Sequence, residues 1–363
     1  MDYRHSRSDD AGQGNICMKY MPWVAFVLSL VITLLLTPLV RSLAERFGAV
    51  AIPRERDVHK KPLPRWGGLA MVGGFMLTMA VVFFWVIGRH IFLKHDALPW
   101  DRPEYIKMAG VTLAILLITV MGAIDDKIEV SAKIQTLALV AAGLILYFSH
   151  IRIEGITNPL HLGPPLKGGR YNPETWVAFA GWFSALATVL WTFGVAKTVD
   201  FIDGLDGLAA GVCAICATTL AIMSGIHSAQ TGQYETTIMA AGLVGCCFGF
   251  LRYNWNPASI IMGTVGAQFL GFMLATISMI GTMKIAATLA VCFPFIVLAV
   301  PVGDGIRVVI TRLIKRTPAY LPDKTSHIHH ILINRGFSTK NAVWLIYGFT
   351  FCCCSLALLL YIH

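Results

Sequence analysis

Long apolar runs separated by short polar segments dominate the sequence. Ten of these runs come close to the ~20 residues that an α-helix needs to cross the hydrocarbon core of a bilayer. Each is therefore predicted to form a transmembrane helix, and Pro294 and Pro301 predict a kink in the ninth. The runs fall at about 20–40, 67–88, 107–124, 132–150, 176–196, 207–226, 237–250, 259–280, 285–309 and 342–362.

The composition excludes a soluble globular protein. Of the 363 residues, 56% are hydrophobic and 13% are charged, whereas soluble domains carry roughly 25% charged residues. We therefore predict an all-α integral membrane protein with about ten transmembrane helices. Residues 1–19 are polar and lack the pattern of a cleaved leader. They are predicted to form a disordered tail before a single transmembrane domain at 20–363.

The net charge of +9 suggests a nucleic-acid partner until the positions of the basic residues are considered. Lys and Arg crowd into 41–65 and 312–340, as expected of cytoplasmic loops, so no nucleic-acid partner is predicted. With ten crossings, the segments around Asp125, Asp200–Asp206 and Asn254 fall on the same face. We expect a multi-pass protein of the plasma membrane, the inner membrane in a Gram-negative cell, whose active face is cytoplasmic.

Four polar clusters lie at helix ends on this face, where ionisable residues are candidate functional groups. The first, at 59–68, includes His59 and Arg65 in a basic loop stiffened by prolines. Such a loop suits an anionic ligand, although its spacing alone favours an ordinary loop that sets the orientation of the chain. The second is the pair Asp125 and Asp126, followed by Lys133. It suits Mg²⁺-assisted phosphoryl transfer, or equally a turn that ends a helix in water.

The third cluster places Asp200, Asp203 and Asp206 at three-residue spacing among glycines and apolar residues. A calcium loop is excluded because the twelve-residue pattern with its closing Glu is missing. The fourth cluster contains His327, His329 and His330. No cysteine or second histidine cluster completes a zinc site, so recognition of sugar hydroxyls or phosphates is favoured over a metal, and simple solvation of the loop ranks behind both.

In this order, the clusters resemble the polyprenyl-phosphate N-acetylhexosamine-1-phosphate transferase superfamily over roughly residues 40–340. The resemblance includes the paired aspartates, the run Ile202–Ala209 and the block from Asn254 to Gly271. It also includes the first and the last of the four clusters. The first reads His59 with Pro62-x-Pro64-Arg65-x-Gly67-Gly68, and the last has the three histidines followed by Arg335-Gly336-Phe337-Ser338.

The resemblance implies a ten- or eleven-helix fold that transfers a sugar-1-phosphate from a UDP-sugar to polyprenyl (undecaprenyl) phosphate. Such a reaction releases UMP, uses Mg²⁺ with Mn²⁺ as an alternative, and initiates cell-envelope glycan synthesis. The His-x-His-His form is more similar to the branch that uses UDP-N-acetylhexosamine than to the branch that uses UDP-MurNAc-pentapeptide, which favours N-acetylglucosamine. The implied partners are both substrates and membrane lipid, and a homodimer is left open.

The resemblance also implies roles for the residues of the clusters. Asp125, Asp126 and Asp203 would be catalytic, with Asp125 and Asp126 near the lipid phosphate and the metal. The substrate-binding residues would be His59, Arg65, Lys133, Asp206, Asn254, His327, His329 and His330. Among these, Lys133 would contact phosphate, Asp206 would lie at the uridine end with Asp203, and the three histidines would line the sugar and pyrophosphate.

Three positions near the implied metal site depart from the family. Lys197 and Asp200 stand where the family usually has asparagines, and Thr264 stands where it has an aspartate. The metal would then be held by Asp200, Asp126 and Thr264. This arrangement predicts that Asp200 and Thr264 face each other across a pocket with Asp126 nearby, and an Asp200–Lys197 pair would count against it.

The departures leave three hypotheses of different classes. The first is an active transferase with a rearranged metal site, which the persisting aspartates and histidines favour. The second is a catalytically silent relative that binds polyprenyl phosphate or a nucleotide sugar. The third is a transporter, although the paired broken helices and internal repeat typical of transporters do not occur in the sequence.

Overall fold

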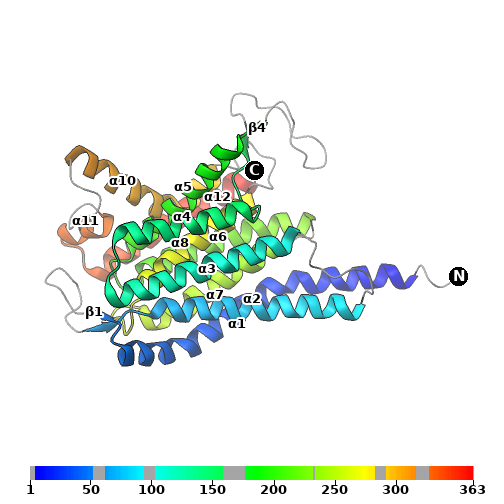
Figure 1. The fold of residues 1–363 in the computed structure, drawn as a ribbon, viewed down its shortest axis with the longest axis horizontal. Helices are drawn as coiled ribbons and strands as arrows, with labels where there is room; N and C mark the ends of the chain where they lie inside the picture. Colours follow the sequence, from blue (N-terminus) through cyan, green and yellow to red (C-terminus); the bar gives the residue numbers. More distant parts are fainter. Residues whose placement is uncertain are drawn as a thin grey trace.

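The protein is a bundle of long α-helices with a two-stranded sheet near each end (Figure 1). The computed structural model describes residues 5–51, 62–93, 103–157, 176–231, 234–282, 292–315 and 327–362. Its helices are α1 (His5–Phe47), α2 (Gly67–Leu93), α3 (Pro103–Ile128), α4 (Ala132–Phe148), α5 (Gly181–Ile202), α6 (Leu208–Thr231), α7 (Glu235–Asn254), α8 (Gly263–Thr282), α9 (Cys292–Val297), α10 (Ala299–Lys315), α11 (Ile328–Asn334) and α12 (Thr339–Ile362).

The all-α membrane class predicted from the sequence is confirmed, although the count of ten crossings is not. Within the described residues, eight helices are long and apolar enough to span a membrane. The apolar helix α4 has only 17 residues, and the run predicted at 176–196 begins with a strand, so that α5 starts at Gly181. In α1, the membrane-spanning part begins at Met18, while the helix extends back into the segment expected as a tail.

The ninth predicted crossing is interrupted rather than continuous. Its described part forms α9 and α10, which are separated at Leu298. Because Pro301 has no N–H, the carbonyl of Val297 receives no helical hydrogen bond from it. The thiol of Cys216 donates to this carbonyl instead, with a sulfur to oxygen distance of 3.1 Å. The proline kink expected from the sequence is therefore a break between two helices.

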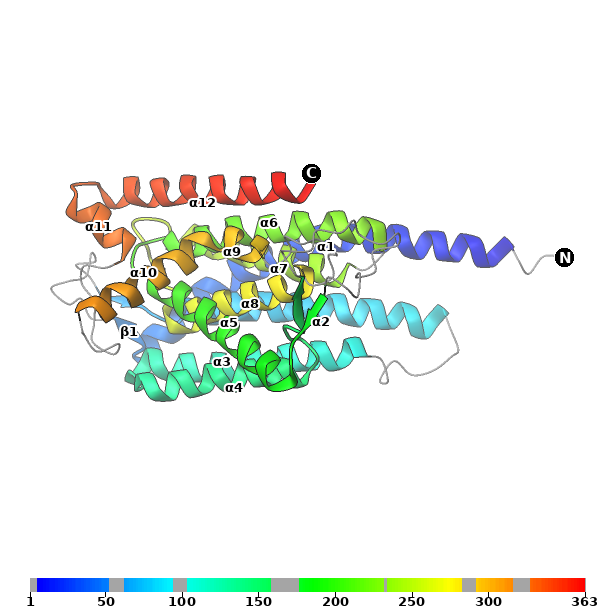
Figure 2. The ribbon, with the colours of Figure 1, turned by 90° about the horizontal axis from the view of Figure 1, so that it is seen from above.

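The most deeply buried helix is α8, which lies inside the bundle in Figure 2 and packs on α2, α3, α5 and α6. Glycines allow three of these neighbours to approach its backbone closely. A Cβ atom built on Gly68 of α2 would lie 2.1 Å from the nitrogen of Gly266, and one on Gly122 of α3 would lie 2.8 Å from Cα of Val265. Gly271 of α8 faces Ala196 of α5 at 2.6 Å in the same way.

Two short antiparallel sheets connect the helices. The strands β1 (Val50–Ala51) and β2 (Leu63–Pro64) pair at one end, and β3 (Gly155–Thr157) pairs with β4 (Trp176–Ala178). The backbone after α7 lies beside the first sheet, because the amide of Ile261 donates to the carbonyl of Pro64 at 3.0 Å. This contact places the first polar loop beside the start of α8. His59 of that loop lies outside the described residues.

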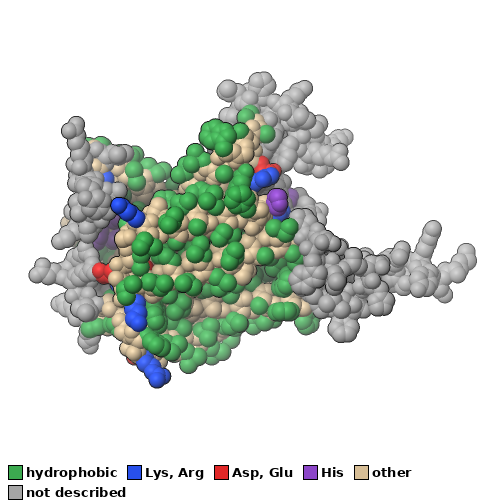
Figure 3. Space-filling model, viewed as in Figure 1, with side chains coloured by type: hydrophobic (Ala, Val, Ile, Leu, Met, Phe, Trp, Pro, Cys, Tyr) green, Lys and Arg blue, Asp and Glu red, His purple; other side chains and the backbone are tan. Residues whose placement is uncertain are grey.

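Hydrophobic side chains cover the middle of the bundle, and charged side chains lie toward its ends (Figure 3). This distribution is the one that a surrounding bilayer requires, because exposed charges are costly within hydrocarbon. Large apolar side chains such as Phe84, Leu137 and Phe349 are accordingly exposed on α2, α4 and α12.

The close contact between α1 and α7 provides a test of this packing. A Cβ atom at Gly245 of α7 would lie 2.2 Å from the carbonyl oxygen of Phe26 in α1. We expect Gly245→Leu to push the two helices apart, to cost about 1–3 kcal/mol, and to lower the thermal unfolding midpoint in detergent. Gly348→Leu in α12 is the matched control, since nothing lies within 4 Å of its built Cβ atom. Equal midpoints for the two variants would contradict the packing described.

Candidate functional site

The carboxylate of Asp126, near the end of α3, caps the start of α8. Its two oxygens accept hydrogen bonds from the backbone amides of Thr264, at 2.8 Å, and Val265, at 3.3 Å. The helix begins at Gly263, whose φ is +68° and whose built Cβ atom would lie 2.4 Å from the Asp126 carboxylate. A carboxylate in this position satisfies amides that have no partner inside the helix and interacts favourably with the helix dipole.

The neighbouring carboxylate of Asp125 is held by three donors. One oxygen accepts from the amide of Val130, at 2.8 Å, and from Nε2 of Gln135, at 2.7 Å. The other oxygen accepts from the hydroxyl of Thr264 at 2.7 Å. Only 8% of Asp125 is exposed, so these contacts fix its orientation.

Asp200 pairs with Lys197 one turn earlier in α5. The Lys197 ammonium lies 2.8 Å from the Asp200 carboxylate and 2.7 Å from Oε1 of Gln135. This is the arrangement that counts against the rearranged metal site. Asp126 and Thr264, the other predicted metal ligands, use their polar atoms within the protein, and no group of three or more His, Cys, Asp or Glu side chains in the described residues is arranged to hold a metal ion.

Asp206 and Asn254 brace the turn between α5 and α6. The Asp206 carboxylate accepts from Nδ2 of Asn256, at 2.9 Å, and from the amide of Ala258, at 3.0 Å. Asn254 accepts from the amide of Gly207, at 3.0 Å, and donates to a backbone carbonyl at 2.9 Å. Both side chains are buried, so their polar atoms position the backbone around the third predicted cluster.

Asp203 differs from the other aspartates. It follows the last residue of α5 and is half-buried, and no hydrogen bond to its carboxylate is found among the described residues. Burial raises the pKa of Asp203 to about 8, and the nearby charges of Asp200, Asp126 and Asp206 add to the effect. A proton or a bound cation would reduce the electrostatic repulsion between these carboxylates.

The histidine cluster reaches this turn. His329 is 1% exposed, and its Nε2 lies 2.4 Å from the place where a Cβ atom would stand at Gly204. Glycine at 204 therefore allows the histidine ring to approach the turn. Burial lowers the pKa of His329 to about 3, with further contributions from His330 and His327. The ring is neutral at physiological pH, and its Nδ1 has no hydrogen-bond partner in the described part of the chain.

His327 is held by a residue that the sequence analysis did not single out. The carboxylate of Asp304 in α10 lies 2.8 Å from Nδ1 of His327 and accepts from the amide of Ile328 at 2.7 Å. Asp304 is 5% exposed. A single acidic residue within the apolar run 285–309 was the available signal, because buried acids in membrane helices usually have a partner.

The remaining predicted residues lie nearby with more exposure to solvent. Arg65 follows β2, and its guanidinium is 3.7 Å from the carboxylate of Glu129. Lys133 is exposed in the first turn of α4. Both side chains could attract an anionic ligand to the end of the bundle that carries Asp125.

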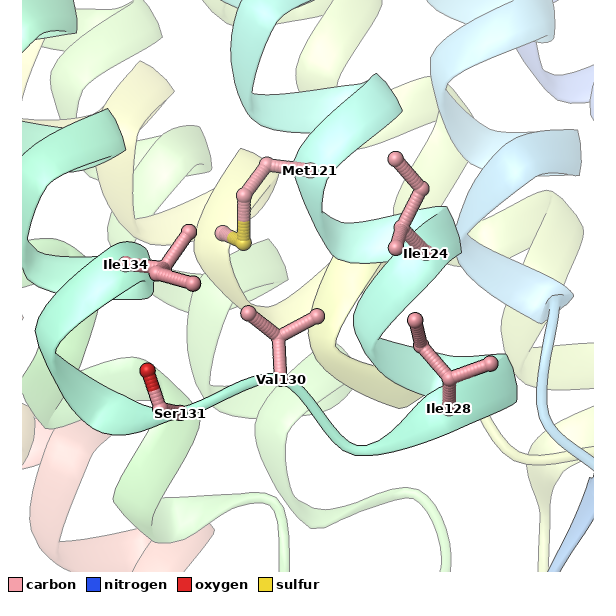
Figure 4. Close-up of a pocket in the computed structure, with 6 residues that line it drawn as sticks. All are labelled: Met121, Ile124, Ile128, Val130, Ser131 and Ile134. Carbon is pink, nitrogen blue, oxygen red and sulfur yellow. The ribbon is translucent and has the colours of Figure 1, made fainter.

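An apolar groove lies beside Asp125, between the end of α3 and the start of α4 (Figure 4). Its volume is about 350 Å³. The amide of Val130, in the wall of the groove, donates to the Asp125 carboxylate. The lining residues are Met121, Ile124, Ile128, Val130, Ser131 and Ile134.

The link between α10 and the histidine cluster yields a prediction. Asp304→Ala would leave Nδ1 of His327 and the amide of Ile328 without their acceptor, at a cost of about 1–3 kcal/mol for each buried group left unpaired. We expect a lower thermal unfolding midpoint in detergent. Arg307→Ala, one turn later on the exposed side of α10, is the control, and an equally small change for both variants would contradict the role given to Asp304.

Comparison with known proteins assigns the chain to a family. Residues 108–282 match the model of glycosyl transferase family 4. The chain is 32% identical to a Bacillus subtilis protein named "probable undecaprenyl-phosphate N-acetylglucosaminyl 1-phosphate transferase", with 90% of this chain and 82% of that protein aligned.

Two further relatives represent different lipid or sugar substrates. A decaprenyl-phosphate N-acetylglucosaminephosphotransferase of Mycobacterium leprae is 32% identical, over 87% of this chain and 78% of that protein. A phospho-N-acetylmuramoyl-pentapeptide-transferase of Streptococcus thermophilus is 27% identical, over 78% and 79%. The resemblance inferred from the four clusters is confirmed, and the chain belongs to glycosyl transferase family 4.

Proposed function

We propose that the protein transfers N-acetylglucosamine 1-phosphate from UDP-N-acetylglucosamine to a polyprenyl phosphate such as undecaprenyl phosphate, and thereby initiates a cell-envelope glycan. The observation that carries the proposal is that Asp125, with the apolar groove beside it, lies at the same end of the bundle as Asp203 and the three histidines (Figure 1). The Bacillus subtilis and Mycobacterium leprae relatives, both named for N-acetylglucosamine transfer, are each 32% identical to the chain, and the relative named for N-acetylmuramoyl-pentapeptide transfer is 27% identical.

The apolar groove and its neighbours suit the lipid substrate. A polyprenyl chain belongs in hydrocarbon, whereas its phosphate must meet a nucleotide dissolved in water. The groove between α3 and α4 lies next to Asp125, and Lys133 at the start of α4 provides a positive charge for the phosphate. Arg65, which pairs with Glu129 just after the end of α3, adds a second positive charge.

The histidines suit the sugar nucleotide. Neutral imidazoles can donate hydrogen bonds to phosphate or sugar oxygens, and His329 is neutral because of its burial. Asp304 holds His327 through Nδ1, which directs Nε2 away from this contact and toward a ligand. Asp206 and Asn254 would act indirectly, by holding the turn that carries Asp203.

The site fits Mg²⁺, or Mn²⁺ in its place, at Asp203 rather than at the ligands predicted from the sequence. The crowded carboxylate of Asp203 lacks a hydrogen-bond partner in the described residues, and Mg²⁺ is commonly held by one or two carboxylates together with substrate phosphates and water. When bound, such an ion neutralises charge on the reacting phosphates. Asp203 would hold it.

In the proposed reaction, an oxygen of the lipid phosphate forms a bond to the β-phosphorus of the nucleotide sugar. The bond from that phosphorus to the oxygen of the α-phosphate breaks, and UMP leaves. Asp125, which three hydrogen bonds hold in one orientation, would fix the α3–α4 turn beside the groove that receives the attacking lipid phosphate. We place this reaction at the cytoplasmic face of the plasma membrane, and a homodimer is compatible with it.

One observation favours a second candidate function. Asp200 is engaged by Lys197, and Thr264 replaces an acid, so fewer carboxylate oxygens are available for a metal than in the family pattern. A relative that binds polyprenyl phosphate or a nucleotide sugar without transfer would show the same contacts. The active enzyme is favoured because Asp125, Asp203 and the three histidines all lie at one end of the bundle (Figure 1).

UMP release by the detergent-purified protein tests the proposed function. With UDP-N-acetylglucosamine, polyprenyl phosphate and Mg²⁺ present, we expect UMP release that requires all three. Asp125→Asn should lower the rate by about 100-fold or more, because it replaces an acceptor with an amide in the contacts that fix the turn beside the lipid phosphate. Glu154→Gln, which removes the same charge beside β3, should leave the rate unchanged.

The result distinguishes the two candidates. Absence of UMP release, together with retained binding of UDP-N-acetylglucosamine, would favour the silent relative. Equal rates for Asp125→Asn and the unmodified protein would contradict the role given to Asp125.

A further inference from the structure

A lysine of α5 lies against one carboxylate of the site, that of Asp200. The side chains of Lys197 and Asp200 are only 16% and 18% exposed, and their charged atoms are 2.8 Å apart. Exposed ion pairs contribute little, but removing one member of a shielded pair leaves a charge that water solvates poorly. The Lys197 ammonium is therefore an integral part of the charge balance at this end of α5.

The same ammonium is connected to Asp125 through one amide side chain. Gln135 accepts from Lys197 at 2.7 Å and donates to the Asp125 carboxylate at 2.7 Å. Because an amide that accepts through its oxygen must donate through its nitrogen, the lysine determines which atom Gln135 presents to Asp125. Lys197 thus contacts one carboxylate and orients a second, on different helices.

Asp200 also contacts a buried amide side chain of α8, that of Gln268. The side chain of Gln268 is fully buried, its Nε2 lies 3.5 Å from the Asp200 carboxylate, and its Oε1 has no partner among the described residues. With Lys197 on one side and Gln268 on another, Asp200 is enclosed by donors from the protein. A divalent cation at Asp200 would have to approach within a few ångströms of the ammonium.

We propose that the Lys197 ammonium is a built-in cation of the site, which occupies Asp200 and orients Asp125 through Gln135 before metal or substrate binds. Lys197 is thus a positioning residue. The ammonium repels a divalent cation from the Asp200 carboxylate. The carboxylate of Asp203 is then the one that would bind the metal. The inference deepens the proposed transferase site.

Metal binding in the absence of both substrates tests the inference. Mn²⁺ can be titrated into the chelator-treated, detergent-purified full chain, with free Mn²⁺ measured by electron paramagnetic resonance. Lys197→Met removes the charge but keeps an unbranched side chain, and it should raise Mn²⁺ affinity at least about tenfold, because a positive charge next to Asp200 is lost. Lys197→Asn, the residue typical of the family, should do the same.

Two controls separate this effect from a general change of charge. Lys107→Met removes the same charge near the start of α3 and should leave Mn²⁺ affinity unchanged. Lys197→Met combined with Asp200→Asn should return the affinity to that of the unmodified protein or below it. An unchanged affinity in Lys197→Met, or a tighter binding that persists without Asp200, would overturn the proposal.

Thermal unfolding keeps the proposal testable where a variant folds poorly. The loss of Lys197 alone should lower the unfolding midpoint, and Mg²⁺ should recover part of that loss by binding the vacated carboxylate. The double variant should be more stable than Lys197→Met in metal-free buffer. A double variant as unstable as the single one would contradict the inference. Since no substrate is present, failure here leaves the UMP measurement unaffected.

Discussion

Both oxygens of the Asp126 carboxylate hold the start of α8, and the other contacts of the site depend on this one. The cap joins the end of α3 to the most deeply buried helix of the bundle. It also places the hydroxyl of Thr264 against Asp125, which completes the set of donors around that carboxylate. A buried charge must be hydrogen-bonded or paired. This requirement explains why the aspartates of the site differ so strongly in their surroundings.

The aspartates therefore divide into those that position the backbone and those that remain available. Asp126 and Asp206 accept from backbone amides, and Asp304 holds both a histidine and the start of α11. Asp203 has a raised pKa and no hydrogen-bond partner in the described residues. Structural carboxylates supply the rigidity that positioning a substrate requires, which leaves Asp203 as the group best placed to bind a cation.

The membrane class and the four clusters could be predicted from the sequence, because apolar runs and charges at helix ends are local patterns. The partners of these charges could not be predicted, since many lie on other helices. Asp200 on α5 shares the Lys197 donor with Gln135 on α4 and accepts from Gln268 on α8. The Asp304–His327 contact could not be predicted for the same reason, because the two residues belong to different segments. The break at Leu298 needed structural information as well, because prolines predict a kink but not the carbonyl that Cys216 contacts.

The central claim is that the site joins a lipid phosphate to a sugar phosphate. Following the β-phosphate of the nucleotide sugar tests this claim most directly. The protein would be given UDP-N-acetylglucosamine labelled with ³²P at the β-phosphate, together with polyprenyl phosphate and Mg²⁺, and the label would be followed into the organic phase. The account predicts that the label moves to the lipid while unlabelled UMP remains in water. Label that stays in the aqueous phase as UDP would show cleavage at the sugar carbon instead, and would contradict the account.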